Sequence, residues 1–534
     1  MARPTGRRHV RIAIIGGGPG GLYLAALLKA ADPRRRVHVF ERNRSDDTFG
    51  FGVVFSDPTL RSLAEGDPVV HHGLLAEGVR WDDIEVRLRG SRIRCGGNGF
   101  VAIARHRLLA LLQERCRGLG VDLHFESPVA LEDLEEADLV VAADGVNSTV
   151  RERLKDVFRP AVTTGSAKFI WLGTTAPFDA LTFVFERREE GWFAVHGYPS
   201  DRGTGAGTFI VETEGETWHR AGLDAFDVGQ PPGPSDLRSR DYLASVFRDH
   251  LDGHALLVNN SRWASFRTVR CRRWRAGRVA LLGDAAHTAH FSVGSGTRMA
   301  MQDALALARA LEVEPSLDRA LQRYERERRP EVERIQGAAR PSLAWWERFG
   351  TYAAHLEPPQ FAYHFLTRSG RVDHRRLGER DPGFVRRVEE WFAAGAGLGE
   401  RRPPLRVPLR RPFAHPTRLW PLEEGLPPGG VRLPAPRSES GLEAARRRAE
   451  RAVAGGATVV ALASASTAES RLCVIRLAEW VRFRLGAAVL LEVPDLDASG
   501  AATLVLSGRA DLIGVPRACI EPMLRSTPDR TGAR

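Results

Sequence analysis

The fold of the chain is decided by a stretch near its beginning, Arg11-Ile12-Ala13-Ile14-Ile15-Gly16-Gly17-Gly18-Pro19-Gly20-Gly21. Gly16, Gly18 and Gly21 have the spacing G-x-G-x-x-G between an apolar strand and a run of helical composition. The first glycine allows a tight turn, the second lets backbone approach a pyrophosphate, and the third permits close packing of helix and strand. Glu41 ends the next strand and can accept hydrogen bonds from a ribose 2′-OH. Val10 to Glu41 therefore predicts a Rossmann-like domain that binds an unphosphorylated dinucleotide such as FAD or NAD.

Length and charge limit the possible classes. A chain of 534 residues is too long for one core and suits about two or three domains. The net charge of +11 comes almost wholly from arginine, which favours a coding bias and gives no reason to expect nucleic-acid binding. The basic run Arg270 to Arg275 is interpreted as a solvated edge. The alternative is that it binds a phosphate group of the substrate.

The remaining composition argues for a cytoplasmic protein without a metal site. The five cysteines are scattered and include no C-x-x-C pair, so neither zinc nor a disulfide framework is indicated. No run approaches the roughly 18 apolar residues of a membrane span, and the first strand begins too early for a signal peptide.

Two further motifs follow strand-like segments. Asp144-Gly145 comes after the apolar run 137–143, and Gly283-Asp284 comes after the run 278–282. The carboxyl ends of strands are where an α/β sheet places its ligand. Asp284 can hold a chain of hydroxyl groups, and the helix that follows Gly294 can stabilise a developing anion.

Between these motifs the period of the sequence changes to two. Residues 167–214 contain several alternating strands with polar or glycine-containing turns, which predicts an antiparallel sheet inserted into the α/β domain. Most of its aromatic residues are expected in the hydrophobic core, and one face of the sheet is a candidate lining for an apolar pocket. Arg105 opens a helix and either pairs with a phosphate or is solvated. The loop Gly50-Phe51-Gly52 either approaches a flat ligand or is an ordinary loop.

Taken together, Gly16/Gly18/Gly21 with Glu41, Asp144-Gly145 and Gly283-Asp284 resemble the single-component FAD-dependent aromatic monooxygenases of the para-hydroxybenzoate hydroxylase type. The resemblance covers roughly residues 10–400. More narrowly, the segments 50–57, 168–174 and 287–297 are similar to the branch that contains salicylyl-CoA 5-hydroxylase and 2-aminobenzoyl-CoA monooxygenase. A flavin hydroxylase of violacein biosynthesis looks like a further relative.

The resemblance implies a role for particular residues. The glycines of the first turn, Glu41 with the adjacent Arg42, and Arg105 would hold the adenosine and pyrophosphate. Asp144 and Gly145 would lie on the pyrophosphate side, and Asp284 on the ribityl chain. The flavin edge would be held by Gly294, Ser295, Gly296 and Thr297. His287 and His290 are the candidate catalytic residues, with packing or loop hydrogen bonding as the alternative, and His290 and Arg298 stand where the wider family has Pro and Asn.

The implied chemistry is hydroxylation of an aromatic substrate, either free or linked to CoA or a carrier protein. NADH or NADPH reduces FAD, O2 adds to form a flavin C4a-hydroperoxide, and one oxygen passes to an electron-rich ring carbon. Two other functions are compatible with the sequence: a flavin halogenase, and an inactive flavin-binding partner of another enzyme. The halogenase is less favoured because the stretch 191–196 lacks that family's second tryptophan and no lysine lies near the flavin loop. We expect a monomer or homodimer.

The predicted domains are an FAD-binding domain (1–160 and 276–400), the inserted substrate domain (161–275), a proline-rich linker (401–440) and a short α/β fragment (441–534). Residues 401–437 contain ten prolines. Ser507 to Ile513 and Arg517 resemble the last phosphate-binding segment of an Old Yellow Enzyme-like FMN barrel. A complete β/α barrel needs roughly 250 residues. The hypothesis is therefore a vestigial barrel that has lost FMN.

Overall fold

The computed structural model describes residues 10–48, 50–226, 233–294 and 296–526. The chain forms two compact units, one of residues 1–85 with 98–347 and the other of residues 86–97 with 348–534. Within the described residues, no helix is both long and apolar enough to cross a membrane.

The first unit is built on a six-stranded sheet in the order β16-β17-β9-β1-β2-β8. All neighbours from β17 to β8 are parallel, and β16 is an antiparallel edge. The strands are β1 (Arg11–Ile15), β2 (Arg36–Phe40), β8 (Asp122–His124), β9 (Leu139–Ala142), β16 (Arg275–Ala276) and β17 (Val279–Leu281). β1 and β9 are almost wholly buried, which explains their unbroken apolar sequences.

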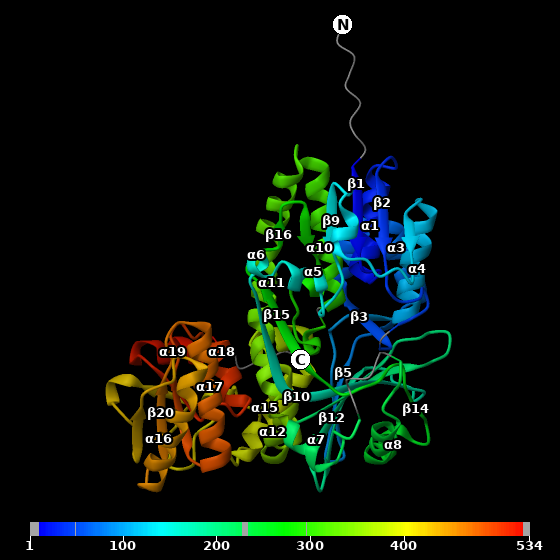
Figure 1. Cartoon of the computed structure of the whole chain (residues 1–534). Helices are drawn as coiled ribbons and strands as arrows, with labels where there is room; N and C mark the ends of the chain where they lie inside the picture. Colours follow the sequence, from blue (N-terminus) through cyan, green and yellow to red (C-terminus); the bar gives the residue numbers. More distant parts are fainter. Residues whose placement is uncertain (1–9, 49, 227–232, 295, 527–534) are drawn as a thin grey trace, which may run out of the picture. The chain divides into compact units, whose positions relative to one another are not determined.

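Helices cover this sheet and complete the core. Helix α1 (Pro19–Ala31) packs against α4 (Arg105–Gly118) and α10 (Gly296–Val313), and α10 packs against the long α11 (Leu317–Trp346) (Figure 1). A small antiparallel sheet of β3 (Gly52–Ser56), β7 (Phe100–Ala104) and β4 (Val79–Trp81) leads into α4. The helices α2 (Asp57–Gly66) and α3 (Pro68–Glu77) lie between β3 and β4 in the sequence.

The inserted segment forms the predicted antiparallel sheet, with β14-β10-β13-β12-β11 as neighbours and β15 paired with β10. Its strands are β10 (Pro160–Thr174), β11 (Leu181–Arg188), β12 (Gly191–Pro199), β13 (Gly207–Thr213), β14 (Leu256–Leu257) and β15 (Ala264–Cys271). The α7 (Gly215–Arg220), α8 (Leu237–Val246) and α9 (Arg248–Leu251) helices accompany it. The Rossmann-like domain with an inserted antiparallel sheet is thus confirmed.

The second unit contains a parallel five-stranded sheet in the order β18-β22-β21-β20-β19. Its strands are β18 (Leu419–Pro421), β19 (Gly430–Leu433), β20 (Val459–Ala463), β21 (Ala488–Glu492) and β22 (Leu512–Val515). Strands β18 and β19 lie within the proline-rich segment 401–440, which therefore supplies two strands as well as connections. The helices are α12 (Phe349–His355), α13 (Pro358–Leu366), α14 (His374–Arg380), α15 (Pro382–Gly395), α16 (Leu442–Ala454), α17 (Ala468–Trp480), α18 (Ala498–Leu506) and α19 (Arg517–Arg525).

Candidate active site

Three separated sequence motifs meet at one edge of the six-stranded sheet. The parallel strands β1, β9 and β17 are direct neighbours, so the turns that follow them lie side by side. Backbone hydrogen bonds join these ends: Ala143 N–H donates to Ile15 O at 2.8 Å, and Leu282 N–H to Ala142 O at 2.9 Å. The crevice at such carboxyl ends is the ligand site of open α/β sheets.

The glycine turn leaves its backbone open to a ligand. Gly16 has φ +112°, and a Cβ there would lie 2.3 Å from the oxygen of Ala143, so no side chain fits. A Cβ on Gly18 would meet nothing within 4 Å, and Gly18 directly precedes α1. Glu41 Oε2 accepts a hydrogen bond from Gly17 N at 2.8 Å. The turn therefore presents helix N–H groups beside a fixed carboxylate, as an adenosine diphosphate requires.

The Asp144-Gly145 turn contains an unsatisfied polar atom. Asp144 Oδ2 accepts from Thr149 N at 2.8 Å, whereas its Oδ1 is buried and has no hydrogen-bond partner among the described residues. Gly145 has φ +80°. Because buried polar atoms are normally satisfied, the free oxygen of Asp144 indicates a place for an outside donor.

Arg151, to which the sequence analysis assigned no role, connects two of the motifs. Its guanidinium donates to Val146 O at 2.6 Å and to Ala285 O at 2.9 Å. The side chain is buried. Its signal in the sequence was weak, because an arginine six residues after a glycine turn is usually solvated.

Asp284 and Arg105 lie close enough for their charges to interact. Both are half-buried, and burial shifts both groups toward neutrality: it raises the pKa of Asp284 and lowers the pKa of Arg105. Each charge partly offsets the shift of the other. Two charged groups that are surrounded by protein yet still accessible are the lining expected for a polar ligand. Arg42, by contrast, is exposed on the surface next to Glu41.

His287 is held inside the protein by an acidic residue of α10. Its Nε2 lies 2.7 Å from Asp303 Oδ2, and Asp303 Oδ1 accepts from Arg328 at 2.8 Å. Burial raises the pKa of Asp303, but the charges and hydrogen bonds of His287 and Arg328 outweigh it and lower the pKa overall. Asp303 also accepts from Gly283 N at 3.1 Å. These contacts favour His287 as a support of the Gly283-Asp284 turn.

His290 lies on the inserted sheet's side of the flavin loop, defined here as residues 287–297. Its Nε2 is 3.3 Å from Glu212, whose other oxygen is 2.7 Å from His196. The sequence analysis missed Glu212 and His196; the available signal was one charged and one titratable residue inside otherwise apolar strands. Four half-buried aromatic rings, defined as the aromatic wall, gather close by: Phe169, Trp171, Phe266 and Phe291.

The rest of the flavin loop leads into α10. Gly294 has φ +60° and is exposed, Gly296 begins the helix, and Thr297 is half-buried in its first turn. Ser295 lies outside the described residues. The 18-residue helix α10 therefore presents free N–H groups and a partial positive charge at this end.

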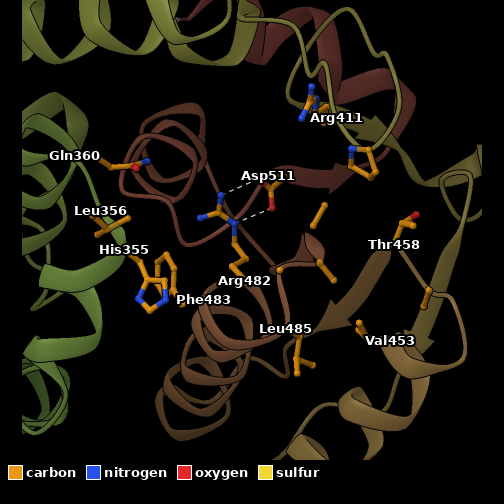
Figure 2. A pocket seen from close by; sticks show the side chains of 15 residues that line it. His355, Leu356, Gln360, Arg411, Val453, Thr458, Arg482, Phe483, Leu485 and Asp511 are labelled. Atoms are coloured by element: carbon orange, nitrogen blue, oxygen red, sulfur yellow. Dashed lines mark hydrogen bonds and ion pairs between the residues drawn. The ribbon is translucent and has the colours of Figure 1, made fainter.

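The second unit has a cavity of about 890 Å³, shown in Figure 2. Thr458, Ala487 and Asp511 line it and directly precede β20, β21 and β22, so it lies at the amino ends of these strands. Arg482, its central cation, is already paired with Asp511 through contacts of 2.7 and 2.8 Å. Helix carboxyl ends, which carry partial negative charge, face this end of the sheet. The cavity is therefore poorly suited to a phosphate.

At the carboxyl ends of the same strands, a carboxylate of the protein occupies the amino end of helix α19. The N–H of Arg517, at the start of α19, donates to both oxygens of Glu423 at 2.9 and 3.0 Å. Its guanidinium contacts Glu424 at 2.6 Å. The N–H at the start of α19 and the guanidinium of Arg517 are therefore already paired with carboxylates of the protein.

Comparison with known proteins agrees with the geometry. A family profile described as "FAD binding domain" matches residues 9–339. The chain is 48% identical over 527 residues to salicyloyl-CoA 5-hydroxylase of a Streptomyces species, covering 95% of this chain and 99% of the relative. It is 33% identical over 378 residues to 3-hydroxy-4-methyl-anthranilyl-[aryl-carrier protein] 5-monooxygenase of Streptosporangium sibiricum, covering 70% of this chain and 99% of the relative. The solved 2-methyl-3-hydroxypyridine-5-carboxylic acid oxygenase shares the fold, with a TM-score of 0.52 at 21% identity over 68% of this chain and 98% of that one.

The names of these relatives decide between the functions that the sequence left open. They describe hydroxylases and monooxygenases that act on aromatic compounds. A halogenase is therefore not favoured, and an active enzyme is favoured over an inactive flavin-binding partner. The residues at the sheet edge fit FAD, because an unsatisfied oxygen, an open glycine turn and a half-buried acid meet there. The chain belongs to the FAD-dependent aromatic monooxygenases, enzymes that use NAD(P)H and O2 to hydroxylate an aromatic substrate.

Proposed function

We propose that the chain hydroxylates a 2-hydroxybenzoyl or 2-aminobenzoyl thioester, with CoA as the thiol, at ring carbon 5. The observation that carries this proposal is the 48% identity to salicyloyl-CoA 5-hydroxylase over 99% of that relative. The carrier-protein relative is named for an anthranilyl group, which is a 2-aminobenzoyl group, and also for position 5. Positions 2 and 5 are para to each other, so both names describe attack opposite an oxygen or nitrogen donor.

We infer the FAD-binding residues from the crevice at the sheet edge. The pyrophosphate takes the N–H groups at the start of α1, beside the turn that contains Gly16, Gly18 and Gly21. Glu41 accepts from the adenosine ribose, with Arg42 at its side. Asp284 accepts from the ribityl hydroxyls. The remaining proposed contacts come from Arg105, Asp144, Gly145, Gly294, Ser295, Gly296 and Thr297.

The bound FAD supplies the oxygen-transfer chemistry, with electrons from NADH or NADPH. The residues of this chain bind the substrate, orient its ring and exclude water from the site. The aromatic wall offers apolar faces for the substrate ring, and a dry pocket protects a reactive oxygen species from water. A donor at carbon 2 makes both carbon 3 and carbon 5 electron-rich, so the orientation of the ring decides that carbon 5 reacts.

The experiment compares 2-hydroxybenzoyl-CoA, 2-aminobenzoyl-CoA and the two free acids with the FAD-loaded protein, O2 and either nicotinamide. We expect NAD(P)H oxidation stimulated by the thioesters, and products heavier by one oxygen atom with the new hydroxyl para to the donor. If only the free acids are hydroxylated, the thioesters are excluded as substrates. Thioester-stimulated oxidation that yields only hydrogen peroxide would exclude hydroxylation of this substrate class.

A further inference from the structure

A buried row of hydrogen-bonding groups runs from the inserted sheet to the flavin loop. Glu212, on β13, lies between two imidazoles: its Oε2 is 2.7 Å from His196 Nε2 and its Oε1 is 3.3 Å from His290 Nε2. His290 Nδ1 is 2.7 Å from Ser292 Oγ, which is 2.9 Å from Ser342 Oγ on α11. We call these five residues the proton row.

The row is buried except at Ser292. The exposed fraction is 4% for His196, 1% for Glu212 and 2% for His290, whereas Ser292 is half-buried. With Nε2 of His290 donating to Glu212, its Nδ1 is left as an acceptor, and it accepts from the hydroxyl and the N–H of Ser292. A proton can therefore enter at Ser292 and reach His290 directly.

The charges of the row suit it to hold one proton. Burial would raise the pKa of Glu212, but the charge of a protonated His290 and the hydrogen bonds from both histidines lower it to about 2, so Glu212 stays ionised when His290 holds the proton. One carboxylate between two imidazoles balances one imidazolium, so uptake of a proton leaves no uncompensated charge inside the protein. Aromatic rings of the neighbouring elements pack on the row's histidines: Phe183 of β11 and Trp346 of α11 on His196, and Phe266 of β15 on His290.

Ser292, the half-buried member of the row, is next to the aromatic wall. Phe291, adjacent to Ser292, contacts Phe169 at 5.0 Å between ring centroids and His196 at 5.4 Å. Phe266 packs edge-on to His290 at 4.9 Å. An aryl ring that lies on these side chains would bring a ring substituent close to Ser292.

We propose that the proton row accepts the proton of the substrate's 2-hydroxyl group. Ser292 meets this hydroxyl, and Glu212 and His196 act as positioning residues. The substrate O–H proton passes to Ser292 as the proton of Ser292 passes to His290 Nδ1, which leaves a phenolate, an imidazolium and no net change in charge. The phenolate donates electrons to carbon 5, and the proton returns when the product oxygen is reprotonated. This inference rests on the proposed function.

The test uses the difference between the two proposed substrates. An aryl hydroxyl such as that of tyrosine ionises near pH 10, so at pH 7 it needs a base, whereas an aryl amine donates its lone pair without losing a proton. We expect Glu212→Gln to lower kcat for 2-hydroxybenzoyl-CoA at pH 7 by about 100-fold, the size of a typical general-base contribution. The loss should shrink as the pH rises, and 2-aminobenzoyl-CoA should be affected far less.

A second measurement does not depend on turnover. Binding of 2-hydroxybenzoyl-CoA to the oxidised FAD-loaded protein at pH 7 should produce the difference spectrum of a phenolate. The phenolate should be absent in Glu212→Gln and in His196→Gln, the variant to use if Glu212→Gln does not fold. The matched control is Glu186→Gln, which removes the carboxylate from another His–Glu contact of the first unit, Glu186 with His250 at 2.7 Å.

The outcomes separate the two proposals. If the wild-type protein neither binds nor hydroxylates the thioesters, the proposed function fails, and the inference fails with it. If it hydroxylates both but binds the hydroxyl compound as a neutral phenol, only the proton row is wrong. Equal losses for both substrates in Glu212→Gln, with FAD content unchanged, would likewise reduce the row to a structural role.

Discussion

At the scale of single residues, Asp284 is the carboxylate on which FAD retention should depend most. It is half-buried, and burial raises its pKa, a shift that the charge of Arg105 partly offsets. Asp284→Ala removes an acceptor for the ribityl hydroxyls, and loss of a hydrogen bond to a charged group corresponds to about 10- to 100-fold weaker binding. We expect largely colourless protein after gel filtration, measured as the ratio of flavin to protein absorbance. The exposed Asp241→Ala is the control, and full flavin occupancy in Asp284→Ala would refute the assignment.

Ionised Asp303 should stabilise the first unit, and this stabilisation should be lost at low pH. Its folded-state pKa is lowered, so its contribution is fully present above the ordinary carboxyl pKa of about 4 and is lost as the pH falls through the lowered value. Asp303→Asn leaves Arg328 without this buried charge partner, at a cost of about 3–5 kcal/mol. We expect urea unfolding at pH 7 to show this loss and the difference from wild type to narrow only below pH 4. A difference that stays constant to pH 3 would contradict the ionic role.

The residues differ in how far the sequence could reveal them. Gly16, Gly18 and Gly21 were predictable because a local turn imposes their spacing. The contact of Glu212 with His196 and His290 was not, because it joins two strands of the inserted sheet to a loop more than seventy residues away. Nothing in one segment encodes the position of the others.

At the scale of elements, the order of the second unit's strands supports the hypothesis of a shortened barrel. β19 to β22 are successive parallel neighbours, and β18, the first in the chain, pairs with β22, the last. A closed β/α barrel pairs its first and last strands in this way, but it has eight strands. We propose that the middle strands were lost. The sequence could not predict β18 and β19, because strands of three and four residues among prolines have no detectable period.

The start of α19 should exclude FMN from this unit. Glu423 already accepts from the Arg517 N–H, and the backbone hydrogen bonds of Glu423 lower the pKa of its carboxyl, so it is charged at neutral pH. Chromatography of the denatured holoprotein should therefore release FAD and no FMN, and added FMN should keep its free fluorescence. Weak FMN binding in Glu423→Gln alone would identify the carboxylate as the barrier. FMN that copurifies in amounts equal to FAD would show that the barrel site is intact.

At the scale of the whole molecule, the proposed FAD residues all belong to the first unit. A mutation that destabilises the second unit should therefore leave the flavin bound. Arg509 is buried and contacts Glu479 at 3.1 Å, Thr367 at 2.9 Å and the oxygen of His364 at 3.1 Å. Arg509→Met leaves the buried Glu479 without its cation, a cost of about 3–5 kcal/mol, or on the order of 10 °C for a unit of this size.

Calorimetry and flavin fluorescence separate these effects. We expect one heat-absorption transition to move to lower temperature in Arg509→Met, while the temperature of flavin release stays at the wild-type value. The control is Arg525→Met, which removes an arginine of the same unit that is 78% exposed and lies 3.6 Å from Glu521. It should shift neither signal, because surface ion pairs contribute little. Flavin release that falls together with the shifted transition would mean instead that the two units unfold as one.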